Sequence, residues 1–386
     1  MSLDKTPNAN RFQIGIFGKR NTGKSSLINA ITNQNVSLVS NIAGTTTDPV
    51  QKAMEIHGIG PCLFIDTAGF DDEGDLGQLR NQKTFDVAKK IDAAIILIND
   101  ENFDMELNFF DKNVPTIFAI NKCDELKNID TLRNKIREKT NLEPICISAK
   151  TKKNIDALID ALIKIKPYTE KNIVDGLVDK NDLVMLVMPQ DIQAPQGRLI
   201  LPQVQTIRSL LDKKCITICT TTDNFTTALE SLKSAPKLII TDSQAFKFVY
   251  ENKPPNSLIS SFSILFAKYK GDITEFIRGA QKIEQLNKNS RVLIAEACTH
   301  VPLEEDIGRV KIPQLLKNKF GCQIEFAHDF PDDLSQFDLI IHCGACMFNR
   351  KYMLARIAQA KNQNIPITNY GLAIAKLTGI LDKVVY

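Results

Sequence analysis

Several features of membrane-spanning, secreted and nucleic-acid-binding proteins are missing from this sequence. Its longest strongly apolar runs, such as Ala93 to Ile98, are far shorter than the roughly 20 residues of a membrane span. The polar N-terminus, MSLDKTPNAN, lacks the apolar core of a signal peptide. A net charge of +3, with no block of like charges, is too small for the clustered basic face of a nucleic-acid-binding protein. The sequence therefore predicts a cytoplasmic protein with no membrane or nucleic-acid partner.

The nine cysteines of the chain are expected to be thiols, because disulfides are rare in the cytoplasm. A close, patterned group of cysteines then indicates a metal site first. Cys215 and Cys219 lie four residues apart on one expected strand, which places both on one face and in the core. The same structural role is expected of four other cysteines and two histidines: Cys62, Cys123, Cys146, Cys322, His57 and His328.

The 386 residues suggest two or three domains, and apolar strands alternate with helical stretches along most of the chain. This alternation is typical of the α/β class, with mostly parallel sheets covered by helices. We expect a nucleotide-binding domain over 1–168, a polar linker over 169–181, and two smaller α/β domains over 182–256 and 257–386. The expected strands are 12–17, 62–66, 93–99, 116–121, 144–148, 183–188, 215–220, 237–241, 292–297, 323–327, 338–342 and 366–369.

A phosphate-binding loop follows the first expected strand. Residues 18–25, GKRNTGKS, fit the G-x-x-x-x-G-K-[ST] pattern and open a helix, which is the context that the motif requires. Its backbone N–H groups and the helix N-terminus favour phosphate oxygens. Lys24 can reach the β- and γ-phosphates, and Ser25 can bind magnesium. The predicted nucleotide-binding residues of this segment are Gly18, Asn21, Thr22, Gly23, Lys24, Ser25 and Ser26.

Three further motifs occur in the order expected of a GTPase. Asp66 to Gly69, DTAG, ends an apolar strand, so that Asp66 can hold magnesium through water and the Gly69 N–H can reach the γ-phosphate. Asn121 to Asp124, NKCD, offers a carboxylate to the N1–H and N2 amine of guanine, a donor pair that adenine lacks. The third motif, Ser148-Ala149-Lys150, can support the guanine O6. The sequence therefore predicts GTP and Mg²⁺ as ligands, with Asn121, Lys122 and Asp124 selecting guanine.

These motifs resemble the Era/TrmE group of translation-factor-like GTPases. Gly44 to Asp48, GTTTD, is similar to the first switch of that group, which implies nucleotide contacts from Thr45 and a magnesium ligand at Thr46. The predicted catalytic residues are Lys24, Thr46, Asp66 and Gly69.

Two residues bear on the rate of hydrolysis. Phe70 stands where Ras-like GTPases carry a water-orienting glutamine, which predicts slow intrinsic hydrolysis. Asn21 occupies the position where related GTPases place a potassium ligand, which predicts stimulation by K⁺. A loop-capping role is the alternative for Asn21.

A cysteine–histidine cluster distinguishes the third expected domain. Cys298-Thr299-His300 follows one strand, and His342-Cys343-Gly344-Ala345-Cys346 follows another. Both segments lie at carboxyl ends of strands, where open α/β sheets bind ligands. Two Cys with two His, or three Cys with one His, suit zinc. Three Cys also suit a 4Fe-4S cluster with one non-cysteine site. The spacing leaves zinc, an iron–sulfur cluster and no metal open.

The whole arrangement resembles the HydF family, the GTPases of FeFe-hydrogenase maturation. The resemblance rests on the GTPase motifs, the C-x-H … H-C-x-x-C pattern and the segment 193–203, QAPQGRLILPQ. It implies a homodimer that pairs through 182–256, and a 4Fe-4S cluster on Cys298, Cys343 and Cys346 in 257–386. It also implies a scaffold that passes a di-iron precursor to apo FeFe-hydrogenase, with the radical-SAM maturation enzymes as further partners.

Three thiolates leave one iron for an exchangeable ligand. His300, Glu305 and His342 are the predicted candidates for the fourth or an outer position, and a hard carboxylate should leave such iron readily. A solvated helix start is the alternative for Glu304 and Glu305, and hydrogen bonding to a ligand is the alternative for His342.

Two other functions remain open on the sequence. One is an RNA- or ribosome-associated GTPase with a structural zinc domain, although the weak net charge disfavours it. The other is a redox-sensing GTPase, which the clustered cysteines permit.

Overall fold

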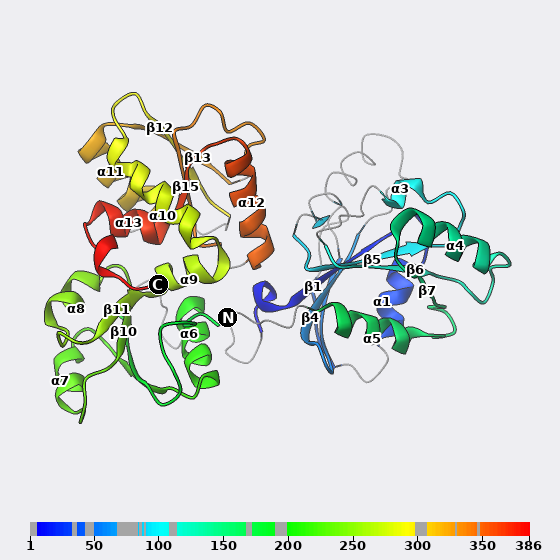
Figure 1. Ribbon diagram of the computed structural model, residues 1–386, viewed down its shortest axis with the longest axis horizontal. Helices are drawn as coiled ribbons and strands as arrows, with labels where there is room; N and C mark the ends of the chain where they lie inside the picture. The colour runs from blue at the N-terminus through cyan, green and yellow to red at the C-terminus, as the bar shows by residue number, and fades with distance from the viewer. Residues whose placement is uncertain are drawn as a thin grey trace. The chain divides into compact units, whose positions relative to one another are not determined.

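A computed structural model describes residues 6–386 except 33–36, 43–49, 68–83, 85–86, 89, 108–113, 167–171, 190–198, 298–306, 329 and 346–347. The chain divides into two compact units, Thr6–Thr169 and a second that contains Glu170–Tyr386 (Figure 1). Both are α/β, with mostly parallel sheets, so the predicted fold class is confirmed.

The first unit is built on a seven-stranded sheet in the order β2-β3-β4-β1-β5-β6-β7. Strands β4, β1, β5, β6 and β7 are parallel, while β2 and β3 add an antiparallel edge. Every residue of β1 and β5 is buried, as expected of central parallel strands. The strands are β1 (Phe12–Phe17), β2 (Ser37–Ile42), β3 (Val50–Ile56), β4 (Gly60–Asp66), β5 (Ala93–Ile98), β6 (Thr116–Ile120) and β7 (Ile145–Cys146). The helices are α1 (Lys24–Thr32), α3 (Asp104–Leu107), α4 (Ile129–Thr140) and α5 (Ile155–Ile165).

The second unit contains two four-stranded parallel sheets. One has the order β11-β10-β8-β9 and the other β13-β12-β14-β15. The first of these sheets comprises β8 (Leu183–Val187), β9 (Ile216–Thr220), β10 (Leu238–Thr241) and β11 (Leu258–Ser261). The other comprises β12 (Arg291–Ala295), β13 (Gln323–Ala327), β14 (Leu339–His342) and β15 (Ile367–Asn369). The helices are α6 (Leu201–Asp212), α7 (Phe225–Glu230), α8 (Phe246–Asn252), α9 (Phe262–Lys270), α10 (Ile273–Lys282), α11 (Ile312–Phe320), α12 (Arg350–Asn362) and α13 (Tyr370–Leu377).

These two sheets share one strand order. Numbered from the first strand of each, both read 2-1-3-4, with the order reversing between the first and third strands. Ligands bind open α/β sheets at that reversal, outside the carboxyl ends of the strands. The reversal lies between β8 and β10 in one sheet and between β12 and β14 in the other. The sequence itself gives no sign of this repeat.

One hydrophobic core joins the two sheets of the second unit. It takes in Val187 and Ile239 from the β8 sheet, and Leu293 and Ile340 from the β12 sheet, with Phe276 of α10 between. The two sheets therefore belong to one packed body, and burial of these side chains is what fixes their strand ends relative to each other.

Several elements differ from the sequence expectation. Strands β2, β3 and β11 and helices α9 and α13 were not expected, and β11 extends the β8 sheet beyond residue 256. Ile173 and Val174, within the expected linker, pack into the core beneath that sheet. The expectation that Cys215 and Cys219 share a buried face is wrong, because Cys215 is buried just before β9 while Cys219 is exposed on it. In the part of the chain described, no helix is long and apolar enough to span a bilayer.

Candidate functional site

The phosphate-binding loop connects β1 to α1 at the carboxyl end of a fully buried strand. Two of its residues have a left-handed backbone, Asn21 with φ of 61° and Gly23 with φ of 94°. A Cβ on Gly23 would lie 2.4 Å from Nδ2 of Asn121, so only glycine fits there. The loop is thus closed by a distant motif of the chain as well as by its own turn.

Lys24 is buried and holds the loop closed. Its Nζ donates to the carbonyl oxygens of Gly18 and Lys19, both at 2.9 Å. These oxygens are neutral acceptors at the place where the motif binds phosphate, and phosphate oxygens form stronger, charge-assisted hydrogen bonds with an ammonium group. The position of Lys24 therefore suits the predicted contact with the β- and γ-phosphates.

Ser25 and Asp66 meet although they are 41 residues apart in the chain. The Ser25 hydroxyl donates to Oδ2 of Asp66 at 2.6 Å. Burial raises the pKa of the Asp66 carboxyl, while the Ser25 hydrogen bond and the charges of Lys24 and Lys52 oppose the rise. A hydroxyl and a carboxylate side by side form the all-oxygen donor set that Mg²⁺ prefers, so these residues fit the predicted magnesium site.

Asn121 links the phosphate loop to the guanine motifs. Its buried Nδ2 donates to the Thr22 carbonyl at 2.7 Å, and its Oδ1 accepts from the Ala149 N–H at 3.0 Å. Neither bond points toward solvent, so this asparagine is a structural bridge between three predicted nucleotide-binding segments. Each segment lies at the carboxyl end of a different parallel strand.

Asp124 lies beside this bridge with its side chain exposed. A hydrogen bond from Ser148 lowers the pKa of the Asp124 carboxyl, which keeps it ionised for the guanine N–H donors. Lys150 is exposed and pairs with Glu125 at 3.1 Å. The structure thus brings together the predicted guanine-binding residues of both motifs.

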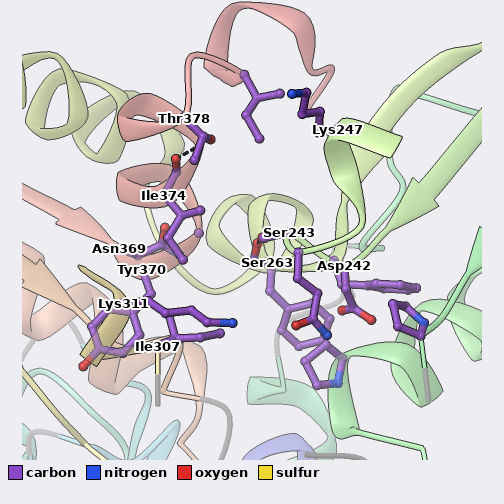
Figure 2. Close-up of a pocket in the computed structure, with 18 of the residues that line it drawn as sticks. Asp242, Ser243, Lys247, Ser263, Ile307, Lys311, Asn369, Tyr370, Ile374 and Thr378 are labelled. Carbon is purple, nitrogen blue, oxygen red and sulfur yellow. Dashed lines mark hydrogen bonds between the residues drawn. The ribbon is translucent and has the colours of Figure 1, made fainter. Parts of the chain in front are cut away.

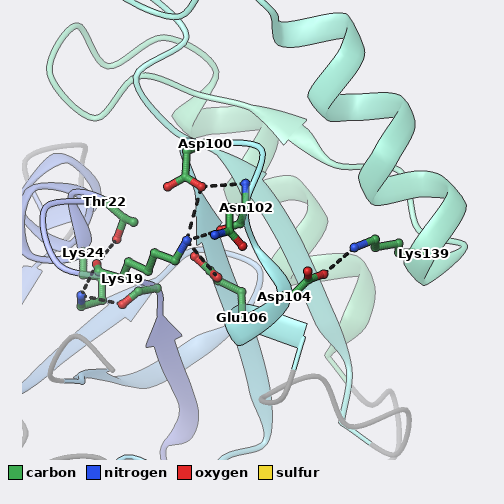
Figure 3. A network of polar contacts seen from close by, with 9 residues as sticks. Lys19, Thr22, Lys24, Asp100, Asn102, Asp104, Glu106 and Lys139 are labelled. Atoms are coloured by element: carbon green, nitrogen blue, oxygen red, sulfur yellow. Dashed lines mark hydrogen bonds and ion pairs between the residues drawn. The ribbon is translucent and has the colours of Figure 1, made fainter. Parts of the chain in front are cut away.

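A polar network that the sequence did not reveal anchors the outer side of the loop (Figure 3). Nζ of Lys19 contacts Oδ1 of Asp100 at 3.3 Å, Oε2 of Glu106 at 3.9 Å and the Asn102 carbonyl. Glu106 is only 1% exposed, whereas Asp100 is half exposed. The network ties the second residue of the phosphate loop to α3. No motif covers the β5–α3 segment, so nothing in the sequence points to it.

Some predicted nucleotide-site residues lie outside the described residues. They are Thr45 and Thr46 of the first switch, Gly69, and the adjoining Phe70. Asn21 is described and exposed, in a left-handed backbone conformation.

Of the three cysteines predicted to bind the cluster, Cys343 is the one among the described residues, and it lies directly after β14. Its N–H donates to the Ala295 carbonyl at the end of β12, and its Sγ accepts from the Ala297 N–H at 3.1 Å. Cys343 therefore faces the segment that runs into Cys298, at the reversal between β12 and β14. A sulfur that already accepts an N–H bond is suited to the thiolate form that binds metal.

His342 is fully buried, and both of its ring nitrogens have protein partners. Nδ1–H donates to the Cys343 carbonyl at 2.6 Å, and Nε2 accepts from Nη1 of Arg356 at 2.7 Å. Burial, reinforced by the Arg356 charge, lowers the pKa of His342 to about 3, so the ring is neutral. Both ring nitrogens are occupied by protein partners in this structure, which fits the hydrogen-bonding alternative for His342: it acts on the loop through the Cys343 carbonyl.

The remaining predicted ligands, Cys298, His300, Glu305 and Cys346, lie outside the described residues, as does Glu304. Within the described part of the chain, no three His, Cys, Asp or Glu side chains gather closely enough to hold a metal. His328, expected to be structural, is half exposed, 3.3 Å from Nη2 of Arg309 and 3.6 Å from Oε2 of Glu296.

A cavity of about 850 Å³ opens beside the Cys343 segment, within the second unit (Figure 2). Residues that follow strands of both sheets line it: Pro189 after β8, Asp242 after β10, Gly344 after β14 and Tyr370 after β15. In Figure 2, Ser243, Ser263 and Asp242 lie across from Lys311 and Tyr370. The cavity is large enough for a small organic or organometallic ligand.

Ser263 stands where the N-termini of α9 and α13 approach each other. Its hydroxyl is 2.9 Å from that of Ser243 and 3.0 Å from that of Ser261, and a Cβ on Gly371 would lie 2.5 Å from it. Two helix N-termini and the lining lysines Lys247, Lys311 and Lys383, against Asp242 and Glu251, give the lining of the cavity a positive bias. The cavity therefore favours an anionic occupant.

Protein-family models match segments of both units of the chain. Residues 173–271 match the hydrogen maturase F dimerization domain, and residues 274–386 match the hydrogen maturase F tetramerization domain. The chain belongs to the hydrogen maturase F family. The predicted membership in HydF is thus confirmed, and the two matched domains hold the β8 and β12 sheets respectively. Residues 13–122 match a model described as 50S ribosome-binding GTPase, so the first unit of this HydF protein contains a GTPase domain.

Curated proteins similar to part of this chain are themselves named as GTPases. GTPase Der of Mycoplasmopsis agalactiae is 34% identical over 203 residues, 46% of this chain and 46% of that protein. The tRNA modification GTPase MnmE of Endomicrobium trichonymphae is 34% identical over 184 residues, 45% of this chain and 38% of that protein. The chain thus spans less than half the length of these relatives.

Among solved structures, Era of Aquifex aeolicus bound to GDP and AlF4⁻ is similar at 20% identity. That comparison has a TM-score of 0.35 and covers 54% of this chain and 92% of that one. The G domain of the FeoB transporter of T. maritima is also similar, at 20% identity with a TM-score of 0.31 over 40% of this chain and 99% of that one.

Proposed function

We propose that this HydF protein is a slow, potassium-stimulated GTPase and a scaffold for FeFe-hydrogenase maturation. In this role it binds a 4Fe-4S cluster and passes a di-iron precursor to apo-hydrogenase. The observation that carries the proposal is the joining of two centres in one chain. The GTPase motifs converge at one sheet, and Cys343 faces the segment leading to Cys298 at the reversal of another.

At the nucleotide site, the residues of the loop bind and orient GTP. Lys24 exchanges its carbonyl partners for phosphate oxygens, and Ser25 and Asp66 hold Mg²⁺, which would neutralise charge on the phosphates. The ionised Asp124 accepts from guanine, and Asn121 keeps the phosphate loop and the Ala149 segment in register. Thr46 and Gly69 complete this assignment as catalytic residues.

Slow hydrolysis and potassium dependence rest on Phe70 and Asn21. Phenylalanine cannot orient water, and Asn21 lies exposed on the loop turn, where its amide oxygen can take part in a K⁺ site. Rates of phosphate release in KCl and NaCl of equal ionic strength test this point. We expect faster release in KCl for the wild type and a loss of the difference in Asn21→Ala. Equal rates in the two salts for the wild type would refute it.

At the second centre, Cys298, Cys343 and Cys346 are the proposed cluster ligands, with His300 or Glu305 as the exchangeable fourth. The Cys343 thiol fits this role because the Ala297 N–H donates to its sulfur and would stabilise the negative charge of its thiolate form. The cluster, when bound, would supply an iron with an open position. The neighbouring cavity, with its positively biased lining and strand ends from both sheets, is the proposed place for the anionic precursor.

Reconstitution distinguishes this function from the alternatives. The protein is purified without oxygen, supplied with iron and sulfide, and examined by EPR after reduction. We expect about four iron per chain and a cluster signal that Cys343→Ser abolishes, while GTP hydrolysis stays near the wild-type rate because it occurs in a separate unit. Stoichiometric zinc with no cluster signal would refute the proposal and favour the ribosome-associated alternative, which the description of the matched GTPase model raises.

Assembly and partners follow from the family. The matched domains are described as dimerization and tetramerization domains, so we propose that the protein forms homodimers and tetramers through residues 173–386. Apo FeFe-hydrogenase and the radical-SAM maturation enzymes are the proposed partners. Nucleotide hydrolysis would control their binding through the switch segments.

A further inference from the structure

Two buried cationic side chains hold the segment that carries Cys343, one by direct contact and one through His342. This segment, here called the Cys343 loop, comprises the described residues 343–345 and 348–349 between β14 and α12. Its carbonyl oxygens are held from the protein interior, directly by Lys270 and indirectly by Arg356. Neither residue belongs to a motif; Lys270 lies more than 70 residues before the loop, and Arg356 lies in α12, the helix that follows it.

Lys270 is the last residue of α9 and is 2% exposed. Its Nζ donates to the Phe348 carbonyl at 2.8 Å and to the Ala345 carbonyl at 3.3 Å, and lies 5.9 Å from the ring centroid of Phe266. Lysine is rarely buried to this degree unless its ammonium group is fully employed. A lysine at a helix end ordinarily extends into water. The loop carbonyls therefore account for its burial.

Arg356 reaches the other end of the loop from α12. It is 7% exposed, and its guanidinium lies 4.5 Å from the ring centroid of Tyr352 and 5.1 Å from that of Phe330. Through Nη1 it fixes Nε2 of His342 as an acceptor, which leaves the proton on Nδ1 for the Cys343 carbonyl. Arg356 thus determines the tautomer of the ring that holds Cys343.

The three carbonyl contacts define the backbone course of the loop. A trans peptide points its C=O and the following N–H in opposite directions, so holding the Cys343 carbonyl directs the Gly344 N–H to the other side. Gly344 lines the cavity. Ala345 has a left-handed φ of 46°, a conformation that costs a residue with a Cβ about 1 kcal/mol and persists only where surrounding contacts maintain it. The Lys270 bond to the Ala345 carbonyl is such a contact.

We propose that Lys270 and Arg356 are positioning residues that hold the Cys343 loop in its ligand-binding conformation before any metal is present. The inference rests on the proposed role of Cys343 as a cluster ligand. Neither cation touches the cluster in this proposal. Each acts through backbone carbonyls, so that the Cys343 sulfur meets the Ala297 N–H and the segment leading to Cys298 without rearrangement. A loop that is already in place loses less conformational entropy when metal binds, so binding costs less free energy.

The test compares Lys270→Met with Lys268→Met in the full-length protein. Both lysines lie on α9, but Nζ of Lys268 donates to the Asp175 carbonyl and not to the loop. The first readout needs no metal: the rate at which iodoacetamide modifies Cys343 in the apo protein, followed by mass spectrometry of its peptide. Loss of one hydrogen bond to a charged group allows a change of about tenfold or more. We expect that change in K270M and none in K268M.

The second readout is iron content and the EPR signal after reconstitution. In K270M we expect iron content to fall severalfold or the EPR line shape to change, with K268M like the wild type. A folded K270M with wild-type alkylation rate, iron content and EPR signal would overturn the inference. If K270M fails to fold, as judged by circular dichroism, the milder Arg356→Lys replaces it, and wild-type behaviour in R356K then overturns the inference.

The two proposals fail in different ways. A wild type that takes up no iron and sulfide defeats the cluster function, whatever the lysine variants do. A wild type that loads normally, beside a K270M protein that also loads normally with an unchanged alkylation rate, defeats only the positioning role. Altered alkylation in K270M together with reduced loading supports both.

Discussion

Replacing Asn121 by alanine should weaken nucleotide binding because it leaves two buried backbone groups of the nucleotide-binding segments without their hydrogen-bond partner. The substitution removes the partners of the Thr22 carbonyl and the Ala149 N–H, which Asn121 holds at 2.7 and 3.0 Å in the interior. Each buried group left without a partner costs about 1–3 kcal/mol. Allowing for some entry of water, the total is about 3 kcal/mol. That corresponds to about a 100-fold rise in Kd if all of it appears in binding.

The division between binding and folding can be measured directly. A fluorescent GDP analogue gives Kd for the wild type, Asn121→Ala and the exposed control Asn134→Ala on α4, and thermal unfolding of the apo proteins gives the part that appears in stability. We expect at least about a tenfold rise in Kd for N121A, because both orphaned groups belong to nucleotide-binding segments. A Kd within twofold of the wild type, with an unchanged midpoint of unfolding, would refute the bridging role.

Three further outcomes follow from charges in the structure. Asp124→Asn should weaken GTP binding and favour xanthosine triphosphate. Because the pKa of Asp124 is depressed, the affinity of the wild type for GTP should stay level from pH 7 to pH 5. A decline of that affinity in fluorescence titrations over this range would contradict the assignment. The pKa of His342 is about 3 in the folded protein, so below pH 6.5 only the unfolded chain gains its proton and the second unit becomes less stable. Urea titrations should show that the free energy of unfolding falls by about 2 kcal/mol between pH 7 and pH 5. This fall should be absent in His342→Gln. Lys19→Met should destabilise the GTPase unit by about 3 kcal/mol, since it leaves the buried Glu106 carboxylate without the Lys19 ammonium. Adding Glu106→Gln should restore most of the lost stability. Equal free energies of unfolding for the single and double variants would contradict the pairing.

The nucleotide site was largely predictable because the residues that contact the nucleotide occur in short contiguous motifs. The expected strand Phe12–Phe17 matches β1 residue for residue. Ser25 and Asp66, predicted from separate motifs to hold magnesium, lie in contact, and so do Asp124 and Ser148 of the two guanine motifs. Each motif directly follows an apolar strand, so strand order alone brings the motifs to one edge of the sheet.

The elements that were missed lack such local signals. Strand β2, SLVSNI, and strand β3, VQKAMEI, mix polar and apolar residues without strict alternation, as antiparallel strands at a sheet edge can. Helix α9, FSILFAKYK, is too short and too apolar to be told from a buried strand by periodicity.

Contacts between residues far apart in the sequence were the other part of the structure that could not be predicted. Lys270 reads as an ordinary lysine at a helix end, and its partners Ala345 and Phe348 are 75 and 78 residues away. For His342 the sequence left ligation and hydrogen bonding open, and its burial beside Arg356 favours hydrogen bonding. The contacts of Lys270 depend on how α9 packs against the β12 sheet, which no single sequence window contains.

The strand order that occurs twice in the second unit provides two equivalent positions for a ligand, one at the reversal of each sheet. The two positions carry different chemistry, since Asp242, Ser243 and Gln244 follow β10 whereas Cys343 follows β14. Residues after both strands line the same cavity. A single occupant can therefore contact polar side chains from one sheet and the Cys343 loop of the other at the same time.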